Sequence, residues 1–212
     1  MAKKLVIFDF DDTLVDTLGA RIPAIIEFCK VEHNVIVSHD NVMSVWGVPF
    51  DQMMTELGCS GEIDKTSYLD ISKRYPLKAF PEVDGVLARL SRGCSLGILT
   101  SLANEVLAQS LRELKWDSGL FKFLYGQEDT PAHKPNPEVF RPVLDNMKLL
   151  GIDVRECLYI GDRLSDAHAA IGAGIDFLGV ARDEDRAREF SALNIPFKTD
   201  LLEIEREVLL PQ

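Results

Sequence analysis

The stretch from Leu5 to Leu14, LVIFDFDDTL, constrains the fold of this chain more than any other segment. Its four leading apolar residues are typical of a strand buried on both faces, as in the centre of a parallel sheet. Asp9 and Asp11 follow this strand. Because strand side chains alternate with a period of two, both carboxylates project to the same side at the carboxyl end, where open α/β sheets bind ligands. The stretch therefore predicts either a ligand-binding site or a simple turn after the strand.

These two interpretations differ in whether the charges of Asp9 and Asp11 must be neutralised. Two carboxylates on one side repel each other, so a site requires a proton on one of them, a bound divalent cation, or both. In the simpler alternative the acids only form a turn after the strand, and Asp12 and Thr13 satisfy local backbone donors. The stretch alone does not decide between them, and the rest of the chain has to.

Length and composition predict a globular protein. The 212 residues suit one domain with an insertion or two small domains, and the hydrophobic fraction of 46% and charged fraction of 27% are ordinary for such proteins. No apolar run approaches the ~20 residues of a membrane span, and the first four residues do not resemble a signal peptide. We therefore expect a cytoplasmic protein without a membrane partner.

Net charge and cysteine spacing argue against nucleic-acid binding, disulfides and zinc sites. The net charge of −11 argues against nucleic acid as a main partner, because phosphate backbones need a basic footprint. The cysteines are far apart in the sequence and form no C-x-x-C pair, so we expect reduced thiols rather than disulfides or zinc ligands. These residues are Cys29, Cys59, Cys94 and Cys157.

The pattern of strands and helices predicts two parts. Residues 15–80 contain no convincing buried strand; we expect helices near 22–31, 39–45, 49–57 and 62–75, with a break at 46–49. From Pro81 onward, strands alternate with helices; the expected strands are 94–100, 123–125, 157–160 and 177–180, and helices close the chain. This order predicts an α/β fold: a Rossmann-like, doubly wound parallel sheet core of residues 1–14 and 81–212, with an inserted all-helical domain of residues 15–80.

Polar residues follow several of the predicted strands. Thr100 and Ser101 follow the second strand, and Gly161 and Asp162 follow a later one, with Asp166 four residues on. In a parallel sheet these ends share one edge, so they can meet Asp9 and Asp11 there. Lys134, which precedes a predicted helix capped by Asn136 and begun by Pro137, can reach the same edge.

This inventory of carboxylates, one hydroxyl and one ammonium matches phosphoryl transfer. Carboxylates and a backbone carbonyl are the ligands that Mg²⁺ prefers, and a carboxylate can attack phosphorus directly. The second acid, Asp11, can protonate the leaving alkoxide. Lys134, Thr100 and backbone N–H groups, together with Mg²⁺, can meet the charge on the transferring group.

Four ordered segments together resemble the motifs of the haloacid dehalogenase superfamily. They are Asp9 to Leu14, Thr100, Lys134 to Pro137, and Gly161 to Asp166, and they span nearly the whole chain. The overall pattern is similar to phosphoglycolate phosphatase-like members. The resemblance implies that residues 15–80 are the family's helical cap, inserted between the first and second motifs, which closes over the site and supplies substrate contacts.

The resemblance also implies roles for single residues. Asp9 would be the nucleophile that forms a phosphoaspartyl intermediate, and Asp11 the general acid and then base. Thr100 would bind the phosphoryl oxygens, with Ser101 beside it, and Lys134 would steady Asp9 and the phosphate. Mg²⁺ would be bound by Asp9, Asp162 and the main-chain carbonyl of Asp11, with Asp166 supporting the metal site.

Two positions narrow the expected activity. The family's dehalogenases lack an acid at position 11, because a halide leaving group needs no proton, so Asp11 favours phosphate chemistry. The sugar phosphomutases commonly have Glu where Gly161 stands, which favours hydrolysis. We therefore expect a Mg²⁺-dependent phosphatase acting on a small phosphorylated metabolite, phosphoglycolate-like or a sugar phosphate, as a monomer or homodimer.

Two alternatives remain open from the sequence. The first is a phosphoryl transferase of the beta-phosphoglucomutase type. The second is not an enzyme: a receiver-like signalling or binding module also holds phosphate on an aspartate with a Thr or Ser and a Lys, although it needs neither the helical insertion nor the second acidic pair, Asp162 and Asp166.

Overall fold

The computed structural model describes residues 2–46 and 50–209 and divides the chain into two compact units. The first unit consists of Met1–Val15 and Ala79–Gln212, and the second is Asp16–Lys78. The break expected at residues 46–49 lies mostly outside the described residues. No helix in the described part of the chain has both the length and the apolar character that crossing a membrane requires.

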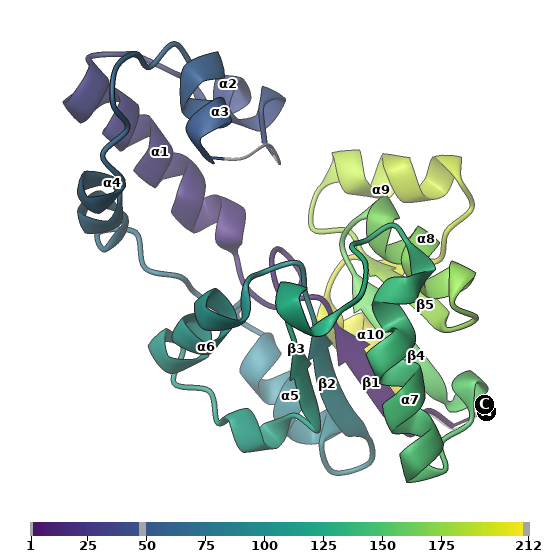
Figure 1. The fold of residues 1–212 in the computed structure, drawn as a ribbon. Coiled ribbons are helices and arrows are strands. Elements are labelled where there is room, and N and C mark those ends of the chain that lie inside the picture. The colour runs from purple at the N-terminus through teal and green to yellow at the C-terminus, as the bar shows by residue number, and fades with distance from the viewer. Residues whose placement is uncertain (1, 47–49, 210–212) are drawn as a thin grey trace. The chain divides into compact units, whose positions relative to one another are not determined.

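The first unit is built on a parallel sheet, which the described residues form from six strands in the order β3-β2-β1-β4-β5-β6 (Figure 1). Every strand pairing is parallel, and β1 lies between β2 and β4. The predicted α/β fold is thereby confirmed. The strands are β1 (Leu5–Phe8), β2 (Ser95–Leu99), β3 (Phe123–Tyr125), β4 (Cys157–Gly161), β5 (Asp176–Val180) and β6 (Phe197–Lys198).

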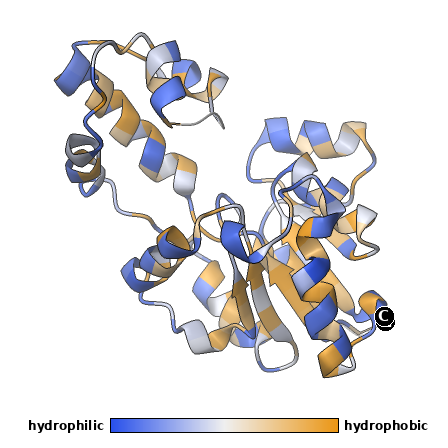
Figure 2. Ribbon diagram, viewed as in Figure 1, coloured by the Kyte–Doolittle hydropathy of each residue, from blue (hydrophilic) through white to orange (hydrophobic). Residues whose placement is uncertain are grey.

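Helices cover both faces of this sheet. Residues Val83, Val86, Leu87 and Leu90 bury one face of α5, which contacts β2 and α10, whereas α8 contacts β4 and β5 on the other side. In Figure 2 the strands are largely orange and the helices alternate orange and blue, as amphipathic helices over a buried sheet should. The helices are α5 (Val83–Leu90), α6 (Asn104–Glu113), α7 (Arg141–Leu150), α8 (Leu164–Gly172), α9 (Glu184–Ala192) and α10 (Leu201–Leu209).

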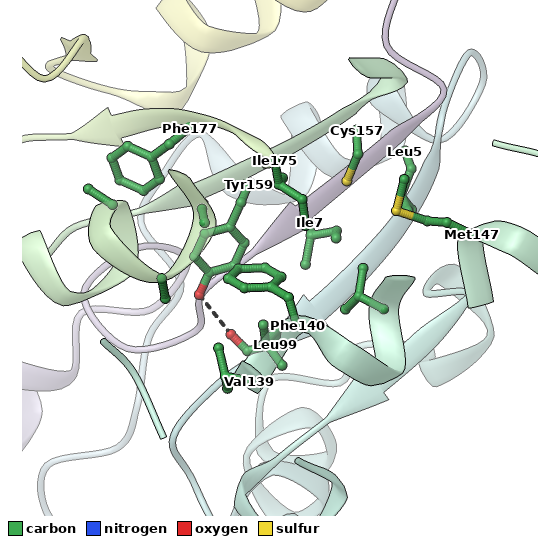
Figure 3. Packing of buried hydrophobic residues seen from close by; sticks show 14 of the residues in the cluster. Leu5, Ile7, Leu99, Val139, Phe140, Met147, Cys157, Tyr159, Ile175 and Phe177 are labelled. Carbon is green, nitrogen blue, oxygen red and sulfur yellow. Dashed lines mark hydrogen bonds between the residues drawn. The ribbon is translucent and has the colours of Figure 1, made fainter. Parts of the chain in front are cut away.

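One core cluster links the strands to α7 and α8. Tyr159 on β4 lies at its centre, with the ring of Phe140 edge-on at a centroid distance of 4.9 Å (Figure 3). Leu5 and Ile7 of β1 and Phe177 of β5 extend this cluster across the sheet. The strands that carry the predicted site residues are therefore held by one continuous apolar core.

The regular elements described in the second unit are helices: α1 (Thr17–His33), α2 (His39–Ser44), α3 (Phe50–Glu56) and α4 (Lys65–Ser72). Asp16 caps α1 by accepting a hydrogen bond from the backbone N–H of Gly19, and Pro23 lies inside this helix. A separate core, centred on Phe28 of α1 with Val42, Met54 and Ile71, packs these helices together.

Two differences from the expected elements have simple causes. Residues 197–198 form a short edge strand, β6, where only helices were expected, because a two-residue strand gives no periodic signal. The helix predicted to begin at Pro137 starts as a 3-10 turn, Pro137–Phe140, and continues as α7. Asn136 caps it as predicted, accepting a hydrogen bond from the N–H of Glu138.

Gly179 of β5 tests this packing. A Cβ atom there would lie 2.6 Å from Cε2 of the fully buried Phe190, so we expect Gly179→Ala to lower the free energy of unfolding by about 1–3 kcal/mol. Gly93→Ala is the control, because its nearest neighbour would be Leu209 at 3.8 Å. Urea unfolding of both variants measures the difference, and equal stabilities would contradict the tight contact.

Candidate active site

The carboxyl ends of the central strands gather the predicted residues at one edge of the sheet. Asp9 follows β1 and Asp162 follows the neighbouring β4, and the N–H of Asp9 donates to the carbonyl oxygen of Ile160 at 2.8 Å. Thr100 follows β2 on the other side of β1. Residues more than 150 positions apart in the sequence are thus brought together because their strands are adjacent.

Three buried carboxylates form the centre of the site. Asp9, Asp162 and Asp166 each offer a carboxylate oxygen, and these oxygens all lie within 4.8 Å of one another. The residues are 6%, 3% and 1% exposed. Three acids at this distance and depth need a compensating positive charge.

Lys134 supplies part of that charge. Its buried ammonium donates to Asp9 Oδ1 at 2.7 Å and to Asp166 Oδ1 at 2.6 Å, and its third contact is the hydroxyl of Tyr159 at 2.9 Å. An ammonium has three N–H donors, so each has a partner in this arrangement. Contact with a phosphoryl oxygen would therefore require the exchange of one of them.

The pKa values reflect this crowding. Burial raises the pKa of Asp9 to about 7; Lys134 opposes the shift, while Asp166 and Asp11 add to it. Burial also raises the pKa of Asp162 well above its ordinary value, with Asp166 and Asp9 contributing. Burial disfavours the charged form of Lys134, but Asp166 and Asp9 outweigh it and raise its pKa. One ammonium thus does not balance three ionised carboxylates, and without a cation Asp9 and Asp162 hold their protons more tightly than free aspartates do.

The surroundings of Asp162 suit a further cation. Its buried Oδ1 has no hydrogen-bond partner among the described residues. Its Oδ2 lies 3.8 Å from Nε of both Arg163 and Arg186, too far for a hydrogen bond. An unpartnered carboxylate oxygen beside two other buried carboxylates is a donor set for a hard divalent cation such as Mg²⁺.

Asp166 is fixed at the start of α8. Its Oδ2 accepts a hydrogen bond from the backbone N–H of Arg163, which leaves Oδ1 directed to Lys134. Gly161 makes this position possible, because a Cβ atom at residue 161 would lie only 2.7 Å from Cβ of Asp166. The Gly161-Asp162 pair and Asp166 therefore form one packed unit.

Asp11, Thr100 and Ser101 lie around this centre rather than in it. Asp11 is half-buried in the turn after β1, where Asp12 adopts a positive φ of 55°, and its charge reaches Asp9. The buried hydroxyl of Thr100 accepts from the N–H of Leu102 at 3.3 Å, and Ser101 is exposed. The hydrogen bonds of the described residues do not join either hydroxyl to the carboxylates.

Sequence reasoning missed two residues. The pattern at Tyr159 predicts only a buried strand, and the signal that could have indicated more is that a buried tyrosine hydroxyl usually has a hydrogen-bond partner. Arg182 follows β5 and donates to the carbonyl oxygen of Thr13 at 2.8 Å and to Glu82 at 2.6 Å. It therefore ties the turn containing Asp11 to the segment before α5, and no local pattern indicated this.

The fold and the cluster define an α/β protein with a buried acidic site at the carboxyl edge of its sheet. The family model described as haloacid dehalogenase-like hydrolase matches residues 6–180, so the chain belongs to this family and is a hydrolase by class. The predicted membership is confirmed.

Relatives and solved structures agree with this assignment. The chain is 29% identical to a provisionally named pyrophosphatase, PpaX, of Caldanaerobacter subterraneus subsp. tengcongensis, over 82% of this chain and 80% of that protein. It is 26% identical to a phosphoglycolate phosphatase of Psychrobacter arcticus, over 92% and 90%. The crystal structure of a provisionally named beta-phosphoglucomutase from Thermotoga maritima shares the fold, with a TM-score of 0.79, 23% identity and coverage of 97% and 100%.

The raised pKa of Asp9 predicts how stability depends on pH without metal. Because the folded-state pKa of about 7 exceeds the ordinary value of 3.8, the folded protein binds more protons than the unfolded chain between these values. This contribution to stability therefore falls as pH rises from about 4 to 7. We expect the wild type to lose more stability than Asp9→Asn between pH 5 and pH 7.5, measured by urea unfolding in EDTA; parallel curves would contradict the shift.

Proposed function

We propose that this protein is a Mg²⁺-dependent phosphatase that hydrolyses a small phosphorylated metabolite through an aspartyl-phosphate intermediate on Asp9. The observation that carries the proposal is the buried cluster of Asp9, Asp162 and Asp166, in which Asp9 and Asp166 pair with the Lys134 ammonium. Membership in the hydrolase family and relatives named phosphoglycolate phosphatase support it.

Asp9 suits the role of nucleophile. Lys134 donates to Oδ1 and so fixes the carboxylate, leaving Oδ2 as the oxygen to attack phosphorus. A carboxylate with a pKa near 7 is only partly ionised in the absence of a cation. Binding of a cation would favour the ionised form, which is the reactive one.

Asp9 and Asp162, with the main-chain carbonyl of Asp11, would hold Mg²⁺, and Asp166 would support the site. When bound, the ion offsets the negative charge of the carboxylates and of the phosphoryl group. The unpartnered Oδ1 of Asp162 and the excess of carboxylates over ammonium support this assignment.

Asp11 would protonate the leaving oxygen and then activate water. Its position two residues after Asp9, half-buried and within electrostatic reach of that carboxylate, suits this role. Thr100 and Ser101 would donate to the phosphoryl oxygens from the end of β2. Thr100 already orders the following backbone through Leu102.

The helical unit Asp16–Lys78 would serve as the cap that contacts the substrate's leaving group and excludes water. The name of one relative, phosphoglycolate phosphatase, favours a small, phosphoglycolate-like substrate, and a sugar phosphate is the other substrate that we propose. We place the reaction in the cytoplasm, with the protein as a monomer or homodimer and without nucleic acid or membrane as partner.

A mutase of the beta-phosphoglucomutase type remains the second candidate, because one structure with this fold carries that name. Gly161 weighs against it. The glutamate common in such enzymes would need a Cβ at 2.7 Å from Asp166. A receiver-like module accounts for neither Asp162 nor Asp166. Release of free phosphate, rather than isomerised sugar phosphate or a phosphoaspartate lasting minutes, separates hydrolysis from both.

Asp9→Asn and metal removal test the nucleophile and the cation. We expect Asp9→Asn to lower phosphate release from p-nitrophenyl phosphate by at least about 10³-fold, because an amide cannot form the acyl phosphate. EDTA should abolish release in the wild type, and Mg²⁺ should restore it and raise the melting temperature. Activity that persists in EDTA would contradict the metal assignment.

Asp11→Asn tests the general acid. A good leaving group needs little protonation, so we expect the substitution to slow an alkyl phosphate such as glycerol phosphate much more than p-nitrophenyl phosphate. The ratio of the two kcat/KM values, compared with that of the wild type, is the measurement. Equal slowing of both substrates would show that Asp11 does not donate the proton.

A further inference from the structure

Tyr159 occupies a position that none of the predicted roles explains. It lies on β4, is fully buried, and its hydroxyl accepts a hydrogen bond from the Lys134 ammonium at 2.9 Å. The hydroxyl also donates to the carbonyl oxygen of Leu99 at 3.0 Å, drawn as a dashed line in Figure 3. Asp166 Oδ1 lies farther away, at 3.4 Å.

The available hydrogen-bond donors and acceptors define the orientation of the Tyr159 hydroxyl. Burial raises the pKa of Tyr159 well above its ordinary value, so the phenol is neutral and carries one proton. That proton serves the nearer acceptor, the Leu99 carbonyl, and the phenol oxygen then faces Lys134 as an acceptor. The hydroxyl therefore links the end of β2 to the loop that carries Lys134.

The Tyr159 ring is held in place by its packing, so its hydroxyl cannot shift easily relative to Lys134. Phe140 packs against it edge-on, with centroids 4.9 Å apart, and Phe177 lies 6.2 Å away. Because a ring held in a close-packed core sets the place of its hydroxyl, the third acceptor of the ammonium is fixed by the core rather than by the loop.

We propose that Tyr159 is a positioning residue for the phosphatase reaction. Its hydroxyl accepts a hydrogen bond from the third N–H group of Lys134 and thereby orients the other two N–H groups toward Asp9 and Asp166. It acts through Lys134 and contacts neither substrate nor reacting atoms. The inference rests on the proposed function for its kinetic consequence, but the ordering of Lys134 does not depend on catalysis.

Tyr159→Phe removes only this hydroxyl and keeps the ring. With p-nitrophenyl phosphate and Mg²⁺, we expect kcat to fall about 10-fold or more and KM to stay within about two-fold, as for partners that orient an active-site group. The matched control is Tyr125→Phe. In the wild type the Tyr125 hydroxyl contacts Asn146 and none of the three carboxylates, so kcat of this variant should stay within about two-fold of the wild-type value.

A second measurement reports the hydrogen bonding of the Lys134 ammonium and does not depend on catalysis. In protein with ¹⁵Nζ-labelled lysine, the Lys134 ammonium should give a slowly exchanging NMR signal, assigned by its loss in Lys134→Gln. We expect hydrogen exchange of this signal to accelerate at least about 10-fold in Tyr159→Phe and to stay unchanged in Tyr125→Phe. A slow signal lost in Tyr159→Phe would support the inference even if the wild type released no phosphate.

Two outcomes would overturn the inference. Unchanged ammonium exchange in folded Tyr159→Phe would mean that the hydroxyl has only a structural role, even if kcat fell. Should this variant not fold, the wild type alone decides: a nuclear Overhauser effect between the Lys134 ammonium and the Tyr159 ring supports the contact, and its absence contradicts it.

Discussion

The site depends on a single buried ammonium shared by two carboxylates. Lys134 neutralises part of the charge of Asp9 and Asp166, and without it the burial of three acids within 4.8 Å would be prohibitively costly. One ammonium does not balance three ionised carboxylates; burial, with repulsion between the acids added to it, raises the pKa values of Asp9 and Asp162. The same arrangement therefore holds the metal-free site together, and its three carboxylates support the proposed binding of a divalent cation.

The architecture explains how such a cluster is maintained. Asp9 and Asp162 follow adjacent parallel strands, so backbone pairing between β1 and β4 sets their separation. Asp166 is held by the backbone of Arg163 at the start of α8, and a glycine at 161 leaves room for it. Electrostatic repulsion between the acids is thus opposed by secondary structure and by the core around Tyr159, in addition to the hydrogen bonds from Lys134.

Much of this could be predicted from the sequence because strands that end in acids are local signals. The apolar run at Leu5–Phe8 and the βα alternation gave the parallel sheet, and adjacency of parallel strand ends indicated that Asp9 and Asp162 meet. Tyr159 and Arg182 could not be assigned, because their partners, Lys134, Leu99 and Thr13, lie 25, 60 and 169 positions away. Such contacts follow from the packed fold, which local periodicity does not encode.

The proposed role of Asp9 is to carry the phosphoryl group during turnover, and chemical trapping of the intermediate tests this role. Turnover of p-nitrophenyl phosphate with Mg²⁺ is quenched in acid, the protein is reduced with borohydride, and its peptides are analysed by mass spectrometry. An aspartyl phosphate is reduced to homoserine under these conditions, so we predict homoserine at position 9, absent when EDTA replaces Mg²⁺. Homoserine at another aspartate, or none at position 9 while phosphate is released, would contradict the account.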